Sequence, residues 1–454
     1  MMCQTTQELK DALKKRNPRS EAVWKRAQMV YPHGQNTGTL DFPPFPFYAS
    51  RAQGAYIWDL DDNRYLDICM TYGVHILGHA PEVITRELHK QMDNGMHYAA
   101  PYEREVEFAE KFTHASPCSD KLIMCNSGTE AVLKAIAIAR ASTGRNRIAK
   151  FEGGFHGPHE YSQWSCFPLD PKQIGPIESP KLVQESLGMP RDIEDSLLLL
   201  PFNDENAFRL IEDHANDLAA VIIEPVLVAY ALPVEQNFFK RLREVTAKCG
   251  VLLIFDEVVT KYRIALGGGE EYFDITPDIN AFGKAIGGGL PVGAVGCRSE
   301  VIDPITSGSR IIELGGTFSG NIMTITAAKT VLEYLLDHPE IYTDLALKGD
   351  TLRSEFNNFS RKHGYPATMT GVGSMFRVLF SSPPLHTPRE CVGENPKLVR
   401  DFHLFLRLAD IYTPYPLRTC YLSTAHNDED VEYLIKTHQN ALQDCMEMNE
   451  NRLW

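Results

Sequence analysis

Between about residues 120 and 300, short apolar runs rich in β-forming residues alternate with segments whose apolar positions repeat at helical spacing. One segment places Phe238, Leu242, Val245 and Cys249 on a single helical face, because their steps are four, three and four residues, and Gly250 ends the helix. Strands that alternate with helices predict a mainly parallel sheet with helices on both faces. The predicted strands are Lys121–Cys125, Arg147–Phe151, Ala219–Glu224, Val251–Asp256 and Val292–Cys297.

The two ends of the chain carry a different pattern. Residues 1–75 are rich in Pro, Tyr and Phe, and a helical stretch beyond about residue 340 precedes Gly371–Phe376, which leads into a predicted strand. A second strand is predicted at Cys420–Ser423, and an acidic-capped helix is predicted to begin at Asn427. The C-terminal part therefore has an α+β pattern.

Composition and charge exclude several classes of protein. The 454 residues include 45 Lys and Arg against 59 Asp and Glu, and the net charge of −14 disfavours nucleic acid as the main partner. No apolar run approaches the roughly 20 residues that span a bilayer, and the first ten residues lack the apolar region of a secretory signal. Ten cysteines without a Cys-x-x-Cys pair favour reduced thiols. We therefore expect a soluble, cytoplasmic protein without a membrane partner.

The first candidate motif is Asn126–Glu130, which follows a predicted strand and opens a helix predicted to run from Thr129 to Thr143. The unpaired N–H groups and the partial positive charge of a helix N-terminus suit a phosphate. Gly128 allows the backbone to approach closely, and Ser127 and Thr129 add hydroxyl donors. On its own, the motif is more typical of an ordinary Ser or Thr helix cap.

The second motif is the buried strand 251–256, which delivers the carboxylate of Asp256 to the edge where open α/β sheets bind ligands. A carboxylate there can hold a cationic ring nitrogen through a hydrogen bond worth about 1.5–3 kcal/mol, or it can bind magnesium. No Gly-x-x-x-x-Gly-Lys-Ser/Thr loop lies upstream to complete a nucleotide site. Glu224 ends another strand in the same way, and a structural ion pair is its simpler explanation.

The third motif is Ala281–Pro291, in which Lys284 is the only charged residue of a glycine-rich turn. A lysine on a surface loop is the ordinary case, but surface lysines rarely lie among Phe, Ile, Leu and four glycines. Apolar surroundings lower the pKa of an amine and favour Schiff-base formation. Together, a phosphate cradle, a carboxylate for a ring nitrogen and a lysine 28 residues (284 − 256) beyond it are the contacts that pyridoxal phosphate (PLP) requires. No metal ion is expected.

With these motifs in place, the chain resembles the class III aminotransferases, the ω-aminotransferase branch of fold type I PLP enzymes. Within that family it is most similar to glutamate-1-semialdehyde 2,1-aminomutase-like members and their aminotransferase relatives. The motifs that carry the resemblance are Asn126–Ala131, Phe151–Gly157, Ile223–Pro225, Asp256–Val258, Phe282–Pro291 and Gly316–Asn321. They keep the family's order and spacing, and the similarity runs from about residue 20 to 445.

The resemblance implies an α/β fold with a seven-stranded-type, mainly parallel sheet in a large PLP-binding domain over residues 76–338. It also implies a small α+β domain that is built from both ends, residues 1–75 and 339–454. The family works as homodimers, and Thr317 resembles a residue that reaches the cofactor phosphate of the neighbouring subunit.

Carried over residue by residue, the resemblance implies that Lys284 forms the Schiff base and that Asp256 keeps the ring nitrogen protonated. The phosphate contacts that it implies are Ser127, Gly128 and Thr129, and the ring-stacking residues are Phe155 and Val258.

Two further residues follow from the same resemblance. His156 would shape the pocket next to the stacking residue, although a structural histidine is nearly as good an explanation. Glu224 would orient groups on the cofactor side of the pocket.

Three departures from the aminomutase pattern concern the substrate. The aminomutases carry an Arg near the N-terminus, where this chain has Asn36–Leu40, and a Glu near the C-terminus, where this chain has Arg418. After Glu224 the chain is more apolar than the aminomutase pattern. Arg418 can supply a two-point carboxylate clamp, or it can form a surface or interface salt bridge. Tyr72 stands where relatives place an aromatic pocket wall, with core packing as the alternative.

We therefore expect a biosynthetic aminotransferase that moves an amino group from an amino donor to an aldehyde or keto acceptor through a pyridoxamine phosphate form. The first alternative is isomerisation on the same scaffold, by an aminomutase or an amino acid racemase, which needs a single substrate. The second is a binding or regulatory protein without cofactor, which the presence of both Lys284 and Asp256 disfavours.

Overall fold

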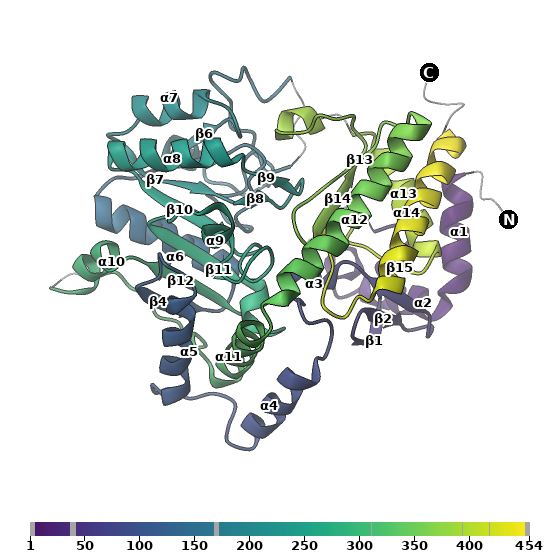
Figure 1. Ribbon diagram of the computed structural model, residues 1–454, viewed down its shortest axis with the longest axis horizontal. Coiled ribbons are helices and arrows are strands. Elements are labelled where there is room, and N and C mark those ends of the chain that lie inside the picture. Colours follow the sequence, from purple (N-terminus) through teal and green to yellow (C-terminus); the bar gives the residue numbers. More distant parts are fainter. Residues whose placement is uncertain are drawn as a thin grey trace.

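The computed structural model describes residues 5–36, 42–167, 172–309, 311–392, 394–416 and 418–449. A seven-stranded sheet forms its larger lobe (Figure 1). Four adjacent pairs in the sheet are parallel, whereas β12 runs antiparallel to both of its neighbours. In spatial order the strands are β4 (Lys121–Cys125), β12 (Gly293–Cys297), β11 (Ile279–Gly283), β10 (Leu252–Glu257), β7 (Leu218–Ile223), β5 (Arg147–Phe151) and β6 (Leu197–Leu200). The predicted mainly parallel α/β fold is confirmed.

Helices cover both faces of this sheet because side chains alternate along each strand. On one face, Ile222 and Ile254 belong to the same apolar cluster as the helix α6 (Gly128–Thr143). On the other face, Val221 and Leu253 share a cluster with residues of α7 (Asn206–Asp213) and α8 (Gln236–Cys249). Three more helices of this lobe are α4 (Glu82–Met92), α5 (Glu103–His114) and α11 (Ile322–Asp337) (Figure 1).

The smaller lobe contains strands from both ends of the chain. The strand β15 (Ile411–Tyr412) pairs in parallel with β3 (Arg64–Asp67), which continues a sheet that also holds β1 (Ala49–Gln53) and β2 (Tyr56–Asp59). A second sheet joins β13 (Thr368–Thr370), β14 (Met375–Leu379) and β16 (Cys420–Tyr421). The helices α1 (Thr6–Arg16), α2 (Pro18–Ala27), α12 (Glu340–His363), α13 (Pro396–Leu408) and α14 (Asp428–Asn449) pack around these sheets (Figure 1).

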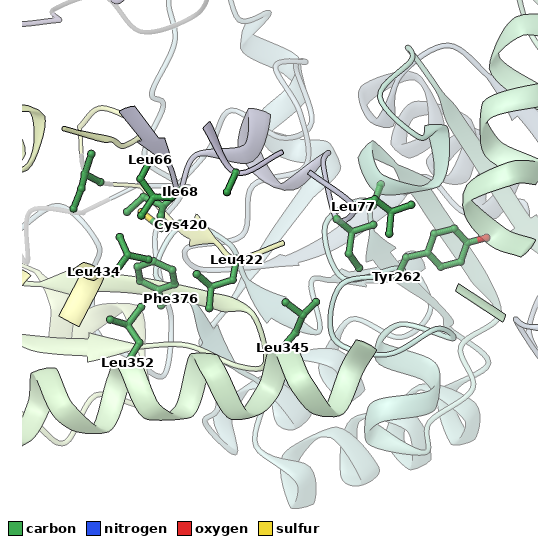
Figure 2. Packing of buried hydrophobic residues seen from close by; sticks show 14 of the residues in the cluster. Leu66, Ile68, Leu77, Tyr262, Leu345, Leu352, Phe376, Cys420, Leu422 and Leu434 are labelled. Atoms are coloured by element: carbon green, nitrogen blue, oxygen red, sulfur yellow. The ribbon is translucent and has the colours of Figure 1, made fainter. Parts of the chain in front are cut away.

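One apolar cluster ties the two ends of the chain together (Figure 2). Leu66, near the N-terminus, lies in the same cluster as Leu352 of α12, Phe376 of β14 and Leu434 of α14. All four side chains are almost completely buried. Because these residues are up to 368 positions apart (434 − 66), the small lobe depends on both ends being present.

Helix ends and most strands fall where the sequence predicts them. Gly144 and Gly250 end α6 and α8 with left-handed backbones, φ 69° and 60°. The antiparallel direction of β12 and the strands β6 and β11 were not predicted. The leucine run of β6 and the sequence Ile-Asn-Ala-Phe-Gly of β11 show no two-residue alternation. Within the described residues, no helix combines the length and apolar character needed to cross a membrane.

The cluster in Figure 2 generates a stability prediction. We expect Phe376→Ala to lower the free energy of unfolding by roughly 3–5 kcal/mol, because it removes a buried aromatic ring from close-packed neighbours. Denaturant titration followed by circular dichroism measures the change. Leu347→Ala, on the exposed face of α12, is the control, and its effect should stay within about 0.5 kcal/mol. Equal effects of both variants would contradict the assigned core.

Candidate active site

Two carboxyl groups meet at the carboxyl edge of the large sheet. Asp256 lies at the end of β10 and Glu224 directly follows β7, and the two strands are parallel neighbours in which Phe255 pairs with Ile223. Both side chains are buried. The sequence places both carboxyl groups at the edge where α/β sheets bind ligands, and the structure confirms this position.

Asp256 is held by two donors from different parts of the chain. Its Oδ1 accepts a hydrogen bond from the N–H of Val258 at 3.0 Å, and its Oδ2 lies 2.7 Å from Nδ1 of His156. Burial lowers the pKa of His156, although the adjacent Asp256 carboxylate opposes that shift. A neutral His156 donates from Nδ1 to the carboxylate, which fixes the orientation of Asp256.

Glu224 uses both oxygens to hold backbone on the same side of the site. Its Oε1 accepts from the N–H of Phe155 at 2.8 Å, and its Oε2 accepts from the N–H of Val228 at 3.2 Å. Burial raises the pKa of Glu224 to about 8, and the negative charge of Asp256 adds to that rise. Glu224 therefore carries a proton at neutral pH, and the simpler explanation of a structural ion pair does not describe it.

Lys284 follows β11 directly and has a left-handed backbone, with φ 51°. Such a φ is uncommon outside glycine and concentrates at functional sites. Burial lowers the pKa of its amine, while the negative charges of Asp256 and Glu224 raise it and only partly offset the burial. The amine thus lies within electrostatic reach of both carboxyl groups and gives up its proton more readily than an exposed lysine.

The start of α6 forms a close-packed backbone cradle. Ser127 is the N-cap, and its Oγ accepts from the N–H of Glu130 at 3.1 Å, so the simple cap is present. The cap leaves the first N–H groups of the helix, those of Gly128 and Thr129, without intrahelical acceptors. A Cβ atom on Gly128 would lie 2.7 Å from Val258, so only glycine lets this backbone approach so closely.

The remaining expected residues surround this centre at different depths. Phe155 is half-buried, and its ring centroid lies 5.6 Å from that of Phe167. Tyr72 is 39% exposed and lies in the short turn Met70–Gly73, which follows β3 along the chain. The guanidinium of Arg418 lies 3.7 Å from the ring centroid of Phe167 and forms no ion pair with any residue of the described ranges. Arg418 and Phe155 therefore contact the same aromatic ring from different lobes.

Two further expectations concern residues away from this centre and stay predictions. Thr317 is exposed on a loop whose Gly316 approaches Asn126 and Glu130, and no hydrogen bond ties its side chain to the described residues. Of the stretch 36–40, which was compared with the arginine-bearing segment of the aminomutases, residues 37–40 lie outside the described residues.

The sequence reasoning missed Phe167 and Arg263. Phe167 supports the Arg418 guanidinium, but nothing in its sequence neighbourhood marks it. Arg263 is buried close enough to Lys284 for its charge to lower the lysine pKa. An available signal was the single arginine before the apolar run Ile264–Leu266, directly beyond the Asp256 motif.

The donors and acceptors of this site fit PLP. Free helix N–H groups suit the phosphate, the buried carboxyl group of Asp256 suits the ring nitrogen, and a lysine of lowered pKa suits the aldehyde. Gly128 and the neighbouring Gly157, whose Cβ would lie 2.6 Å from Oγ1 of Thr129, keep the phosphate cradle tight. The fold and the site together define a fold type I PLP-dependent enzyme.

Comparison with known proteins agrees with this class. The model of the family "Aminotransferase class-III" matches residues 40–400. Glutamate-1-semialdehyde 2,1-aminomutase of Methanosarcina acetivorans is 36% identical over 427 residues, which cover 93% of this chain and 98% of that protein. The crystal structure of an omega-transaminase from Sphaerobacter thermophilus shares 37% identity with a TM-score of 0.88, covering 94% of this chain and 97% of the other.

A solved transaminase with PLP bound is also similar, with 25% identity and a TM-score of 0.84 over 95% of this chain and 98% of the other. The chain belongs to the class III aminotransferase family. It is a PLP-dependent enzyme that acts on small molecules.

The raised pKa of Glu224 generates a pH prediction. Between the ordinary glutamate pKa of about 4.3 and the folded value of about 8, only the folded protein holds this proton. The contribution of Glu224 to stability is therefore complete at low pH and is lost as the pH rises through this range. We expect the Tm of the wild type, relative to Glu224→Gln, to fall between about pH 5 and 8 and then level off.

Thermal unfolding at several pH values measures this difference. Glu205→Gln, at an exposed position, is the control and should give a constant offset from the wild type. Parallel Tm curves for the wild type and Glu224→Gln would show that Glu224 is ionised in the folded protein.

Proposed function

We propose that this enzyme is a two-substrate aminotransferase, which takes an amino group from an amino donor and delivers it to an aldehyde or keto acceptor. The observation that carries the proposal is that Lys284 directly follows β11, with its half-buried side chain within electrostatic reach of Asp256 and Glu224. The similarity to an omega-transaminase supports it. The aminomutase relatives at 36% identity keep isomerisation, by an aminomutase or a racemase, as the second candidate.

The apolar segment after Glu224 favours transamination over aminomutase chemistry on glutamate semialdehyde. Leu227 and Tyr230 are fully buried, and Val228 donates its N–H to Glu224. An apolar wall suits a donor or acceptor that is bulkier or less polar than glutamate semialdehyde.

Each site residue has a defined task in this proposal. PLP, when bound, supplies an electron sink and carries the amino group between the two substrates. The N–H groups of Gly128 and Thr129, with the Ser127 hydroxyl, would hold its phosphate. Phe155 and Val258 would flank its ring.

Protons are handled by the three buried groups. Asp256, oriented by His156, would accept a hydrogen bond from the protonated ring nitrogen. The Nζ atom of Lys284 would bind the cofactor aldehyde, and its lowered pKa would let it accept and return a proton at the reacting carbon. Glu224 stays protonated and holds the Phe155 backbone.

Arg418 and Tyr72 are the proposed substrate contacts. Burial lowers the pKa of Arg418 to about 10, which still leaves the guanidinium charged at neutral pH. Stacked on Phe167 and without an ion pair among the described residues, it can bind a substrate carboxylate at two points. A salt bridge in an assembly is the competing role for Arg418, and core packing is the competing role for Tyr72.

A homodimer is part of the proposal. Large apolar side chains are exposed close to Thr317, with Phe318 61% exposed, and also at Ile311 and Met96. An exposed apolar surface of this kind marks an interface, and it supports a role for Thr317 in the neighbouring site. The nine cysteines of the described residues are all free thiols, which supports the cytoplasmic location.

The central prediction concerns Lys284. We expect Lys284→Ala to lose both turnover and the visible absorbance band of lysine-bound cofactor, because no other amine replaces the Schiff base. The exposed Lys240→Ala is the control and should keep both. A panel of glutamate, alanine, a β-amino acid and an ω-amine, scored by bleaching of the band, identifies the donor. Sustained turnover on one substrate without an oxo acceptor would favour the isomerase, and turnover by Lys284→Ala would refute the mechanism.

A second prediction concerns Arg418. We expect Arg418→Ala to raise KM about 10- to 100-fold for carboxylate-bearing donors, because a hydrogen bond to a charged group contributes about 1.5–3 kcal/mol. The KM of a simple ω-amine, which has no carboxylate, should stay unchanged and serves as the internal control. Steady-state kinetics of both donors decides between a substrate clamp and a structural role.

A further inference from the structure

The segment Met70–Gly73, which carries Tyr72, forms a left-handed turn. The four consecutive residues from Met70 to Gly73 have positive φ angles of 42°, 53°, 57° and 89°. L-residues adopt this region singly and not in runs, because Cβ approaches the following carbonyl oxygen. Thr71 is β-branched, the residue type for which such a φ is a genuine outlier. This backbone persists only where its surroundings hold it.

Contacts at both ends hold the turn in place. Before it, Oδ1 of Asp67 accepts from the N–H groups of Cys69 and Met70, at 2.7 and 2.9 Å. After it, Nη2 of Arg263 donates to the carbonyl oxygen of Gly73 at 2.7 Å. Tyr421 packs so closely against Gly73 that a Cβ there would lie 2.9 Å from its ring.

Arg263 reaches the turn from the other lobe. It follows Asp256 by seven residues (263 − 256), and its Nη1 donates to the carbonyl oxygen of Leu422 at 2.7 Å and to Oγ of Ser374 at 3.4 Å. Its side chain is fully buried, and no carboxylate pairs with it among the described residues. Burying a cation that is paired only with neutral groups costs free energy, so packing alone does not explain why an arginine occupies this position.

Arg263 lies near the expected cofactor residue Lys284 and also holds the turn that carries Tyr72. The charge of Arg263 reaches Lys284, and Tyr72 lies close enough to Arg418 to interact with it electrostatically. We propose that Arg263 is a positioning residue, which holds Tyr72 against the substrate by fixing the left-handed turn from Met70 to Gly73. The inference rests on the proposed function, because it takes Tyr72 as a wall of the substrate pocket.

Positioning and a purely structural role predict different kinetics. If Arg263 positions Tyr72, Arg263→Gln lowers kcat/KM for the preferred donor about 10- to 100-fold, mainly through KM, since small displacements of a pocket wall have effects of that size. The cofactor content stays unchanged, because the contacts proposed for the cofactor come from other segments. A purely structural role lowers Tm and leaves KM unchanged.

Thr71→Asn supplies a rescue test. Asparagine tolerates the left-handed region, so this exposed substitution removes strain that Arg263 otherwise has to hold. We expect the double variant Arg263→Gln/Thr71→Asn to recover most of the lost KM. Thr71→Asn alone should raise Tm and leave the kinetics unchanged.

The experiment compares these variants as purified holoenzymes by donor titration of the absorbance band, steady-state kinetics and Tm. Arg145→Gln is the matched control, because Arg145 also bridges two backbone carbonyls, of Leu218 and Gly250, but at the opposite edge of the sheet. Its KM should equal that of the wild type. If Arg263→Gln does not fold, Arg263→Lys with and without Thr71→Asn takes its place.

An increased KM that Thr71→Asn restores supports the inference. An unchanged KM, or an increase that Thr71→Asn leaves in place, overturns it. Tyr72→Ala separates this failure from failure of the proposed function: if Tyr72→Ala leaves KM unchanged, Tyr72 is not a substrate contact and the pocket assignment itself is wrong.

Discussion

The site depends on the burial of three ionisable groups at one edge of a sheet. Asp256, Glu224 and Lys284 cannot all keep their charges there without a net negative charge in a medium of low dielectric constant. The pKa of about 8 for Glu224 resolves the conflict, because its proton leaves one carboxylate opposite one amine. The lowered pKa of the amine also comes from burial, which the charges of the two carboxyl groups only partly offset.

The same edge explains why two adjacent acidic residues have different roles. Successive side chains of a strand point to opposite faces, so Asp256 faces the site while Glu257 faces away. Glu257 accepts from the N–H of Glu270, whose own carboxylate accepts from Ser116 and Asn280. This buried network packs behind β10 and supports the strand that carries Asp256.

The sequence predicts what local rules control. Glycine stops, apolar periodicity and carboxylates at strand ends are local features, and they predict α6, α8, β10 and the three candidate cofactor motifs. It did not predict the pairing of His156 with Asp256, 100 residues apart, because no local pattern encodes it. The left-handed backbone of Met70–Gly73 could not be predicted either, because Met, Thr and Tyr do not favour that conformation. Tertiary contacts impose both features.

Substrate and cofactor contacts are distributed differently over the two lobes. The expected cofactor residues within one chain all belong to the large sheet and its loops, whereas Tyr72 and Arg418 come from segments of the small lobe. Polar contacts join the lobes: Arg389 binds both carboxylate oxygens of Glu152, at 2.6 and 2.8 Å, and Thr370 donates to the carbonyl oxygen of Tyr230. If the proposed contacts hold, residues of the small lobe can change with the substrate while the cofactor chemistry is preserved.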